Sequence, residues 1–472
     1  MNLLFCASEA VPFSKTGGLA DVAGALPKQI VKLGHQVIVL TPMYESIYKN
    51  IDDFTHLGQK EVYIQNETYL ANYYQTIVDG VTYVFIENDL LFKRKGYYGY
   101  YDDEKRFIFF SYAILEFVTL TKRVDLIHLN DWQTALIPYL LDELYRYKKG
   151  YEHLKTLLSI HNLEYQGSFN KDFYPMIGTP FSYAYIHFDR INFLKAGIMR
   201  ADYINTVSQT YSNEIKTQYY GFTLDGALNS RASNFRGILN GIDYDIYNPE
   251  TDAFIDYPFN QKNFITQKRK NKLELLKSLG LDQSSDIALV CYIGRLAKQK
   301  GVDLFMTTLE ETICKSNANY IFIGSGDEVY ENFLRDMSYR YPSKFYAYIG
   351  FNNSLAHQVY ASSDILVMPS QFEPCGLSQM IAMRYATLPL VRETGGLKDT
   401  VIPYNKYTKE GNGFSFANYN AHELRDVLLS AISLHNNDKK SWQILQRHAL
   451  NEDFSLNKMG IAYLELYQEI IK

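Results

Sequence analysis

The stretch Ser370-Gln-Phe-Glu-Pro-Cys-Gly-Leu-Ser-Gln-Met380 decides how the rest of this chain is interpreted. It follows Asp364-Ile-Leu-Val-Met-Pro369, which is short and apolar enough for a buried parallel strand. The residues after it, Met380-Ile-Ala-Met-Arg-Tyr-Ala386, have helix-forming composition. The sequence therefore places Glu373 to Leu377 in the turn between the carboxyl end of a strand and the amino end of a helix. Open α/β sheets bind ligands at such turns.

This turn combines two kinds of binding group. The backbone N–H groups of Cys375, Gly376 and Leu377 are expected to point at a ligand, and the helix dipole favours an anion there. The Glu373 carboxylate can accept hydrogen bonds from two neighbouring sugar hydroxyls, while the N–H groups hold a phosphate. The same pattern also fits an ordinary capped turn, so the remaining motifs decide between the two interpretations.

Length and composition describe a globular protein of more than one domain. The chain has 472 residues, too many for one hydrophobic core. Hydrophobic residues make up 47% and charged residues 21%, as in ordinary globular domains. The formal net charge of −5 argues against nucleic acid as a partner. No apolar run is long enough to cross a bilayer, so we expect no membrane partner either.

The cysteines and the first residues predict the compartment. Four cysteines, Cys6, Cys291, Cys314 and Cys375, lie far apart and form no Cys-x-x-Cys pair. We therefore expect neither a disulfide framework nor a structural zinc site. Residues 1–8 are apolar but lack a basic leader, which indicates a first strand and not a signal peptide. These features predict a cytoplasmic protein.

The chain opens as a strand–helix–strand unit. Strands are expected at residues 2–8 and 36–41, and apolar residues recur at helical spacing between Leu19 and Leu33. Pro27 predicts a kink or a split in this helix. The loop Lys15-Thr-Gly-Gly18 offers glycines for close approach of a ligand and a lysine for an anionic group. On its own this loop is a weak signal.

Residues 62–120 predict a hairpin, a loop and a helix. Val62 to Glu87 alternates like paired strands, with Asp79-Gly80 as the turn. Lys93 to Asp102 is rich in cations and tyrosines and predicts an exposed, mobile loop. That loop suits contact with a sugar polymer and equally suits a plain surface role. Arg106 to Leu120 is expected to be helical.

Polar residues follow buried strands in this half of the chain. Asp131 comes after the strand expected at residues 124–130, and His161 after the one at residues 156–160. Both belong to the carboxyl edge of a sheet, where ligands bind, although a lone histidine also suits a structural role. Asp243 and Asp245 form an Asp-x-Asp pattern, which binds a metal in some sugar transferases. Its setting between a Gly-rich turn and Asn-Pro favours a linker turn, so we expect no metal.

The second half repeats the strand–loop–helix pattern. A strand at residues 287–293 precedes Gly294-Arg-Leu-Ala-Lys-Gln-Lys-Gly301, and a helix is expected from Val302. The cations of this loop suit a leaving diphosphate, but they also suit a solvated basic loop. Further strands are expected at residues 320–326, 345–349, 364–369 and 388–391. Residues 254–272 are polar and irregular, as in a passage between domains.

One short sequence occurs in both halves. Thr16-Gly-Gly-Leu-Ala-Asp21 and Thr394-Gly-Gly-Leu-Lys-Asp399 differ at one position. With strand–helix alternation in both halves, this echo favours two similar domains, and a chance match of Gly-rich turns is the alternative. Ser455 to Lys472 predicts an amphipathic helix, with Ser455 as N-cap, that must dock on the rest of the protein.

Together these motifs resemble the bacterial glycogen synthases and plant starch synthases, the ADP-glucose-using family, over essentially the whole chain. The motifs are Lys15-Thr-Gly-Gly-Leu-Ala-Asp-Val22, Asn130-Asp-Trp-Gln-Thr134, Ile160-His-Asn-Leu163, Tyr165-Gln-Gly167, Asn240-Gly-Ile-Asp243, Gly294-Arg-Leu296, Gln299-Lys-Gly301, Glu373-Pro-Cys-Gly-Leu377 and Thr394-Gly-Gly-Leu397. Each is modest alone, but their occurrence in this order is highly specific.

The resemblance implies an α/β fold of the GT-B type, in which two Rossmann-like, doubly wound domains face each other across a cleft. The expected domains are residues 1–243 on the glucan side and residues 244–454 for the nucleotide sugar. A helix at residues 455–472 is expected to cross back to the first domain. Closure of the domains on the substrates is expected as well.

The resemblance also implies an activity. The enzyme would transfer an α-D-glucosyl group from ADP-glucose to the non-reducing 4-hydroxyl of an α-1,4-glucan. Configuration would be retained and ADP released, in glycogen biosynthesis. No cofactor and no metal are expected, and the oligomeric state stays open.

Roles for individual residues follow from the same resemblance. Arg295 and Lys300 correspond to the cations on the donor diphosphate, and Glu373 to the glutamate on the glucose 3- and 4-hydroxyls. His161 corresponds to the histidine near the glucose 6-hydroxyl, and Lys15 to a lysine close to the donor phosphates and the acceptor. These five are the expected catalytic residues, and all five also contact the donor. The other expected donor-binding residues are Gly18, Asp21, Asp131, Asn240, Cys375, Gly376, Leu377, Thr394 and Gly395.

The expected chemistry is retention without a clear nucleophile. A retaining enzyme calls for a carboxylate on the β face of the sugar, and the motifs offer no convincing one. Our hypothesis is same-face attack, in which the leaving phosphate oxygen takes the proton of the acceptor. Gln371 departs from the family, where arginine is frequent, and Leu456 stands where tryptophan often follows Ser455. The Gln371 change bears on donor affinity more than on chemistry.

Other functions fit parts of the sequence. A GT-B glucosyltransferase that uses UDP-glucose would keep the fold, and a catalytically silent glucan-binding homologue would keep every binding residue. A phosphorylase would need a pyridoxal-phosphate lysine site, which the sequence does not show. A secreted sugar-binding protein would need a signal peptide, which the first residues do not resemble.

Overall fold

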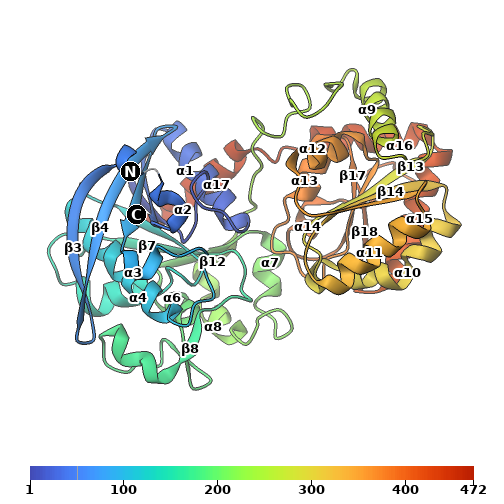
Figure 1. Cartoon of the computed structure of the whole chain (residues 1–472). Helices are drawn as coiled ribbons and strands as arrows, with labels where there is room; N and C mark the ends of the chain where they lie inside the picture. The colour runs from blue at the N-terminus through green and yellow to red at the C-terminus, as the bar shows by residue number, and fades with distance from the viewer. Residues whose placement is uncertain (50) are drawn as a thin grey trace. The chain divides into compact units, whose positions relative to one another are not determined.

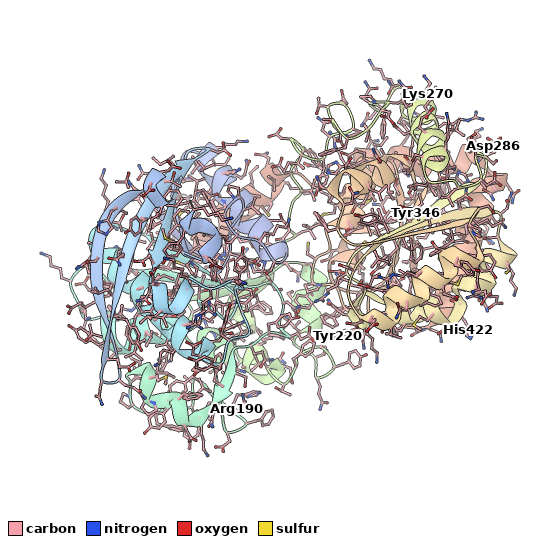
Figure 2. The ribbon with its side chains drawn as sticks, viewed as in Figure 1. Arg190, Tyr220, Lys270, Asp286, Tyr346 and His422 are labelled. Carbon is pink, nitrogen blue, oxygen red and sulfur yellow. The ribbon has the colours of Figure 1, made fainter. Side chains whose placement is uncertain are left out.

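The chain folds into two compact units. The computed structural model describes residues 1–49 and 51–472. Unit 1 comprises Met1–Asn240 together with Leu456–Lys472, and unit 2 comprises Gly241–Ser455 (Figure 1). Exposed side chains such as Lys270 and Asp286 point outward from unit 2 (Figure 2). In the described part of the chain, no helix is long and apolar enough to cross a membrane.

Unit 1 is built on a nine-stranded sheet in the order β12-β11-β7-β6-β1-β2-β5-β4-β3. Its strands are β1 (Asn2–Cys6), β2 (Gln36–Pro42), β3 (Thr55–Ile64), β4 (Glu67–Val78), β5 (Val81–Glu87), β6 (Leu126–Asn130), β7 (Lys155–Ile160), β11 (Tyr203–Thr206) and β12 (Phe235–Gly237). Neighbours from β12 to β5 are parallel, and β4 and β3 form an antiparallel edge. The central parallel strands are continuous apolar runs because helices cover both faces of the sheet.

The turn at Asp79-Gly80 joins β4 to β5, so this hairpin prediction is confirmed. Both turn residues have positive φ, 52° and 79°. A type I′ hairpin turn requires positive φ at both central residues, and Asp and Gly adopt it readily. A third strand, β3, pairs with β4 from Thr55 onward and extends the sheet beyond the predicted hairpin.

Helix α1 (Gly18–Lys32) runs through Pro27 as one element, so of the predicted kink or split the split is wrong and the kink stays a prediction. Proline removes one backbone hydrogen bond from a helix. Pro27 is buried, however, and α1 packs against β2 and α17 (Leu456–Ile471). This packing of a buried helix face offsets the lost hydrogen bond.

Helix α17 follows unit 2 in sequence but packs in unit 1, beside α1 (Figure 1). Its tyrosines reach buried polar side chains of the sheet. The Tyr463 hydroxyl accepts a hydrogen bond from Asn205 Nδ2 at 2.9 Å, and the Tyr467 hydroxyl lies 2.8 Å from His128 Nδ1. The predicted amphipathic helix is therefore part of the core of unit 1.

The remaining elements of unit 1 cover the sheet or connect its strands. The helices are α2 (Glu45–Tyr48), α3 (Asp89–Phe92), α4 (Asp103–Phe117), α5 (Ile137–Leu140), α6 (Phe193–Arg200), α7 (Gln209–Glu214) and α8 (Asp225–Ser230). Short 3-10 helices lie at Ile51–Asp53, Val118–Leu120, Lys171–Ile177 and Ala232–Asn234, and a π-helical turn lies at Leu141–Tyr145. A small antiparallel sheet contains β8 (Ser168–Asn170), β10 (Arg190–Asn192) and β9 (Ile186–His187).

The loop Lys93–Asp102 is partly exposed, as predicted, and side-chain hydrogen bonds hold it in place, while its mobility stays a prediction. Arg94 Nη1 and Nη2 donate to the two Asp102 carboxylate oxygens at 2.6 and 2.8 Å. The Tyr98 hydroxyl lies 2.7 Å from Ser8 Oγ, just after β1. Arg94 thus ties the two ends of the loop together, and Tyr98 holds the middle of the loop beside the end of β1.

Unit 2 is built on six parallel strands in the order β15-β14-β13-β16-β17-β18. The strands are β13 (Ala288–Ile293), β14 (Ala318–Gly324), β15 (Phe345–Ile349), β16 (Ile365–Met368), β17 (Leu388–Arg392) and β18 (Phe414–Phe416). The helices are α9 (Phe264–Ser278), α10 (Val302–Lys315), α11 (Glu328–Arg340), α12 (Asn353–Ser362), α13 (Ser378–Arg384), α14 (Gly395–Thr400), α15 (Ala421–Asn437) and α16 (Lys439–Asn451), with a single turn η6 at Lys298–Lys300.

Helix α9 occupies part of the stretch that was predicted to be irregular, so that prediction is wrong for residues 264–272. The buried residues of α9 include Lys268, Asn271 and Lys272. Polar side chains at core positions interrupt the hydrophobic period by which an amphipathic helix is recognised. The sequence pattern therefore hid this helix.

The two segments by which the chain enters and leaves unit 2 pair with each other. Ile242 N donates to the Phe454 carbonyl at 2.8 Å, and the Tyr244 hydroxyl accepts from Phe454 N at 2.9 Å. Asp243 Oδ1 accepts the Asp245 N–H at 2.8 Å, a contact within a turn. The Asp-x-Asp pattern is thus used for local turn structure.

Each sheet has one place where the strand order reverses. In unit 1 the chain builds outward from β1 on one side and from β6 on the other, and in unit 2 it does so from β13 and β16. Ligands of open α/β sheets bind beyond the carboxyl ends of the strands at such switch points. A ligand is therefore expected at the loops that follow β1, β6, β13 and β16.

Candidate functional site

At the switch point of unit 2, the loops after β13 and β16 meet through an ion pair. Lys300 Nζ lies 2.5 Å from Glu373 Oε2, and Ser370 Oγ donates to the same oxygen at 3.1 Å. Glu373 is only 6% exposed. Its other oxygen, Oε1, accepts no hydrogen bond from the residues that the structure describes. The carboxylate is therefore held at one oxygen and available to a ligand at the other.

Arg295 joins this group through Gln299 and not through Glu373. Arg295 Nη2 donates to Gln299 Oε1 at 2.6 Å, and Gln299 Nε2 donates to the Phe372 carbonyl at 3.3 Å. Gln371 N also donates to the Gln299 carbonyl at 2.8 Å. The guanidinium itself is exposed. Two cations and one carboxylate thus surround a short stretch of loop, an arrangement that suits a phosphorylated sugar.

Two glycines allow the loops to approach this closely. Gly301 has φ of 77°, and a Cβ there would lie 2.2 Å from the Pro369 carbonyl oxygen. Gly395 has φ of 46°, and a Cβ there would lie 1.9 Å from the Glu373 carbonyl oxygen. Gly396 N donates to that same carbonyl at 3.1 Å. The Thr394-Gly395 segment therefore lies directly against the turn that carries Glu373.

The predicted backbone donors precede α13, as the sequence indicated. Among the described residues, neither the Gly376 nor the Leu377 N–H donates to a protein acceptor. Cys375 is buried beside them. All the predicted site residues of unit 2 thus belong to one connected group of loops.

The predicted residues of unit 1 lie in the loops after β1 and β6. Lys15 Nζ pairs with Asp21 Oδ1 at 2.7 Å, and both side chains are more than one-third exposed, at 55% and 38%. Gly18 begins α1 in the same loop. The carboxylate of Glu9 holds this loop, because its Oε2 accepts from Thr16 N at 2.5 Å and from Thr16 Oγ1 at 2.7 Å. Burial raises the pKa of Glu9, whereas these Thr16 contacts lower it.

Asp131 and His161 contact each other at the ends of β6 and β7. His161 N donates to Asp131 Oδ1 at 2.7 Å, and Asp131 has φ of 55°. Asn130 Nδ2 donates to the Cys6 carbonyl, which turns Asn130 Oδ1 toward His161 Nε2 at 2.9 Å. His161 therefore carries its proton on Nε2, and its Nδ1 is an acceptor. Burial lowers the pKa of His161 to about 4, so the ring is neutral at pH 7.

Asn240 ends unit 1 and is buried. Its side-chain oxygen accepts no hydrogen bond from a described residue. The predicted residues of unit 1 thus form the pairs Lys15–Asp21 and Asp131–His161, and Asn240 stands at the end of the unit. Among the described residues, no cluster of His, Cys, Asp and Glu is arranged to hold a metal ion.

Three side chains of these groups were not predicted: Glu9, Ser370 and Gln299. Glu9 follows β1 as Asp131 follows β6, so the rule that singled out Asp131 also applies to Glu9. Ser370 and Gln299 lie inside motifs that were recognised. Their hydrogen bonds join residues far apart in sequence, and a linear pattern does not reveal such pairs.

The Asp131 carboxyl gives unit 1 a measurable pH dependence. Burial raises the pKa of Asp131 to about 7, and the hydrogen bonds from His161 and Asn162 lower it only in part. Between about pH 4 and 7 the folded state keeps a proton that the unfolded state has lost, so the free energy of unfolding falls as pH rises. We expect Asp131→Asn to remove this slope, because the amide does not titrate. Asn also tolerates the positive φ of this position, so the backbone is kept. Relative to wild type, the variant gains on the order of 2–3 kcal/mol between pH 5 and 8.

Urea unfolding at pH 5, 6, 7 and 8 measures this difference directly. The contribution of His161 to stability changes with pH in the opposite direction. Its lowered pKa makes the folded state lose stability as pH falls from about 6.5 to 4. His161→Gln therefore flattens the acid side of the curve. A constant difference between wild type and Asp131→Asn at all four pH values contradicts the assignment.

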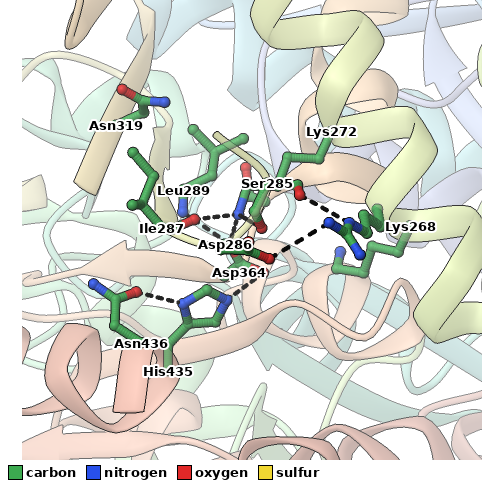
Figure 3. Close-up of polar contacts among 12 residues, drawn as sticks. Lys268, Lys272, Ser285, Asp286, Ile287, Leu289, Asn319, Asp364, His435 and Asn436 are labelled. Atoms are coloured by element: carbon green, nitrogen blue, oxygen red, sulfur yellow. Dashed lines mark hydrogen bonds and ion pairs between the residues drawn. The ribbon is translucent and has the colours of Figure 1, made fainter. Parts of the chain in front are cut away.

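A second buried polar cluster lies at the opposite, amino-terminal edge of the unit 2 sheet. Lys272 of α9 and His435 of α15 both point at Asp364, which precedes β16 (Figure 3). Lys272 Nζ lies 2.6 Å from Asp364 Oδ2, and His435 Nε2 lies 3.3 Å from Oδ1. Burial alone raises the pKa of Asp364, but His435 and Lys272 lower it well below its usual range. The cluster joins two helices to the sheet and is separate from the site.

Family models match both halves of the chain. One described as the starch synthase catalytic domain matches residues 2–230, and one described as glycosyl transferases group 1 matches residues 279–444. The chain is 54% identical over 474 residues to a glycogen synthase of Acholeplasma laidlawii, covering 100% of this chain and 99% of the relative. It is 44% identical over 482 residues to a glycogen synthase of Bacillus anthracis, covering 100% of each.

Solved structures show the same similarity. The catalytic domain of starch synthase IV from Arabidopsis thaliana, bound to ADP and acarbose, matches with a TM-score of 0.90 and 33% identity over 99% of each chain. A sucrose-phosphate synthase from Thermosynechococcus elongatus matches with a TM-score of 0.64 and 15% identity, covering 99% of this chain and 98% of that one. At that identity the second match supports the fold alone.

Proposed function

The chain belongs to the glycogen synthase and starch synthase family, and from this premise we propose how its residues bind ADP-glucose and extend a glucan. It is a retaining glycosyltransferase with the GT-B fold, a glycogen synthase by similarity over its full length. Its substrates are a nucleotide-sugar donor and an α-1,4-glucan acceptor, and we place it in the cytoplasm without membrane or nucleic-acid partners.

The Lys300–Glu373 pair is the observation that carries this proposal. The cation and the carboxylate are 2.5 Å apart at the unit 2 switch point, and Glu373 keeps one oxygen for a ligand. Lys300 and Arg295 hold the diphosphate of the donor, with Thr394, Gly395 and the N–H groups after Glu373 as further phosphate contacts. Glu373 accepts hydrogen bonds from the glucose 3- and 4-hydroxyls. Sugar and phosphate are thereby bound side by side.

The unit 1 residues act on the transferred glucose and the acceptor. His161 is neutral, so its Nδ1 accepts a hydrogen bond from the glucose 6-hydroxyl. Lys15, paired with Asp21, offers its charge to the donor phosphates when substrate binds. Gly18, Asp131 and Asn240 complete the donor contacts in this proposal.

The reaction proceeds on one face of the sugar in this proposal. The acceptor 4-hydroxyl attacks the anomeric carbon as the bond to the diphosphate oxygen breaks, and that oxygen takes the hydroxyl proton. Lys300 and Arg295 stabilise the negative charge that develops on the diphosphate. Glu373 holds the ring hydroxyls and forms no bond to the sugar, so no carboxylate nucleophile is needed.

The test is incorporation of glucose into glycogen with ADP-glucose and UDP-glucose in parallel assays, with release of nucleoside diphosphate monitored. We expect incorporation with ADP-glucose to exceed that with UDP-glucose. Preference for UDP-glucose supports the alternative GT-B transferase and rejects the proposed donor. Binding of glycogen without transfer from either donor supports a silent glucan-binding homologue.

A further inference from the structure

Gln299 is placed where it can hold Arg295 against the turn that carries Glu373. It lies in η6, one residue before Lys300. Its carbonyl accepts from Gln371 N at 2.8 Å, and its side-chain Nε2 donates to the Phe372 carbonyl at 3.3 Å. Backbone and side chain thus bind consecutive residues of the other loop. Residue 299 is fixed opposite residues 371 and 372, which brings Lys300 to Glu373.

The second contact of the Gln299 side chain is with a cation of the site. Gln299 Oε1 accepts from Arg295 Nη2 at 2.6 Å. A guanidinium can only donate and a carbonyl can only accept, so the orientation of the amide between them is unambiguous. Among the described residues, the Arg295 guanidinium has no other hydrogen-bond partner. Its position therefore depends on Gln299.

The backbone of Arg295 is held independently of Gln299. The Tyr292 hydroxyl donates to the Arg295 carbonyl at 2.8 Å, and Ala297 N donates to it at 3.1 Å. Loss of the Gln299 side chain would leave this loop in place while freeing the exposed guanidinium. A long exposed side chain loses rotamer entropy when a ligand fixes it, and a pre-formed contact removes part of that cost.

We propose that Gln299 is a positioning residue of the donor site, which pre-orients Arg295 for the diphosphate by tying it to the Phe372 carbonyl. The inference rests on the proposed role of Arg295 in donor binding. Glutamine suits this task because its amide accepts from the cation at one end and donates to the loop at the other. Glutamate would lose the donor, and methionine of similar length would lose both contacts.

A double-mutant cycle on ADP binding tests this role without turnover. Titration calorimetry with ADP is run on wild type, Gln299→Met, Arg295→Ala and the double variant. We expect Gln299→Met to weaken ADP binding about tenfold, the loss for a hydrogen bond to a charged group. In the background of Arg295→Ala the same change should have an effect of less than about twofold, because the group that it positions is gone.

Two further measurements separate positioning from general support of the fold. Gln358→Met is the control, since Gln358 is a half-buried glutamine of α12 whose side chain forms no hydrogen bond with a described residue. It should bind ADP as wild type does. Gln299→Met should unfold at the wild-type temperature, and its KM for the donor should rise more than its kcat falls. Equal ADP affinity of Gln299→Met and wild type, or additive losses in the cycle, overturns the proposal.

Failure of the proposed function would look different. If Arg295 did not bind the diphosphate, Arg295→Ala would bind ADP as wild type does, whatever Gln299 contributes. If Arg295→Ala weakens ADP binding and Gln299→Met does not, the donor site stands and only the positioning role falls.

Discussion

Replacing Lys300 by methionine lowers kcat/KM for the sugar donor about a hundredfold to a thousandfold. Removal of one pre-organised donor to developing charge in an active site has an effect of that size. Lys300 has two partners in the proposed reaction. It faces the diphosphate, and it holds Glu373 Oε2 at 2.5 Å. The substitution therefore removes a cation from the leaving group and also frees the carboxylate that fixes the glucose.

Steady-state kinetics with ADP-glucose and glycogen measures this loss. Lys298→Met is the matched control, because Lys298 is an exposed lysine of the same turn and its side chain forms no hydrogen bond or ion pair with another described residue. It should keep nearly the wild-type kcat/KM. Lys300→Arg should recover part of the loss by restoring the charge with a different geometry. Equal activity of Lys300→Met and Lys298→Met would place the diphosphate elsewhere.

Replacing Asp364 by asparagine destabilises unit 2 by about 3–5 kcal/mol, the typical cost of removing one partner of a buried ion pair. The Lys272 side chain is 3% exposed, so its charge cannot move into water when Asp364 is neutralised. Leu289 N, which donates to Asp364 Oδ2 at 2.8 Å, keeps an acceptor in asparagine, and the loss is therefore one of charge. For a unit of this size, we expect its unfolding transition to move down by roughly 10 °C.

Calorimetric scans of the whole protein resolve this shift. Asp286→Asn is the control: Asp286 lies 3.6 Å from Arg269 and its side chain is 79% exposed, so its loss should change stability by less than about 1 kcal/mol. The double variant Asp364→Asn, Lys272→Met keeps an acceptor for Leu289 N and removes both charges, so it should recover part of the stability. Equal transitions for Asp364→Asn and Asp286→Asn would show that the cluster is not stabilised by charge pairing.

The sequence predicted most of the parallel strands of both units and their alternation with helices, but it did not predict β18 at the edge of the unit 2 sheet. Apolar runs such as Ile287–Ile293 and Phe345–Tyr-Ala-Tyr-Ile349 form strands close to the expected bounds. These predictions succeeded because a strand buried on both faces leaves an uninterrupted apolar signal. Helix α9 was missed because Lys268 and Lys272, which indicate an exposed face, point into the protein.

The site was predicted unevenly for a related reason. Residues that follow strands, such as Glu373, are recognisable because position along the chain implies position at the edge of the sheet. The contact of Ser370 or Gln299 depends on which loop lies beside which, and two glycines with positive φ set that approach. Any Cβ at position 395 would clash with the Glu373 carbonyl, and neither hydropathy nor residue spacing reveals this requirement for glycine. The predicted roles of the site residues themselves stay predictions.

The placement of α17 fixes the order in which the protein can be completed on the ribosome. The whole of unit 2 is synthesised between the last strand of unit 1 and the helix that finishes it. Until residue 471 has emerged, the buried polar side chains of His128 and Asn205 lack the tyrosine hydroxyls that bind them, and unpaired buried polar groups are destabilising. Unit 1, although most of it is made first, therefore reaches its native core only after unit 2 has been synthesised.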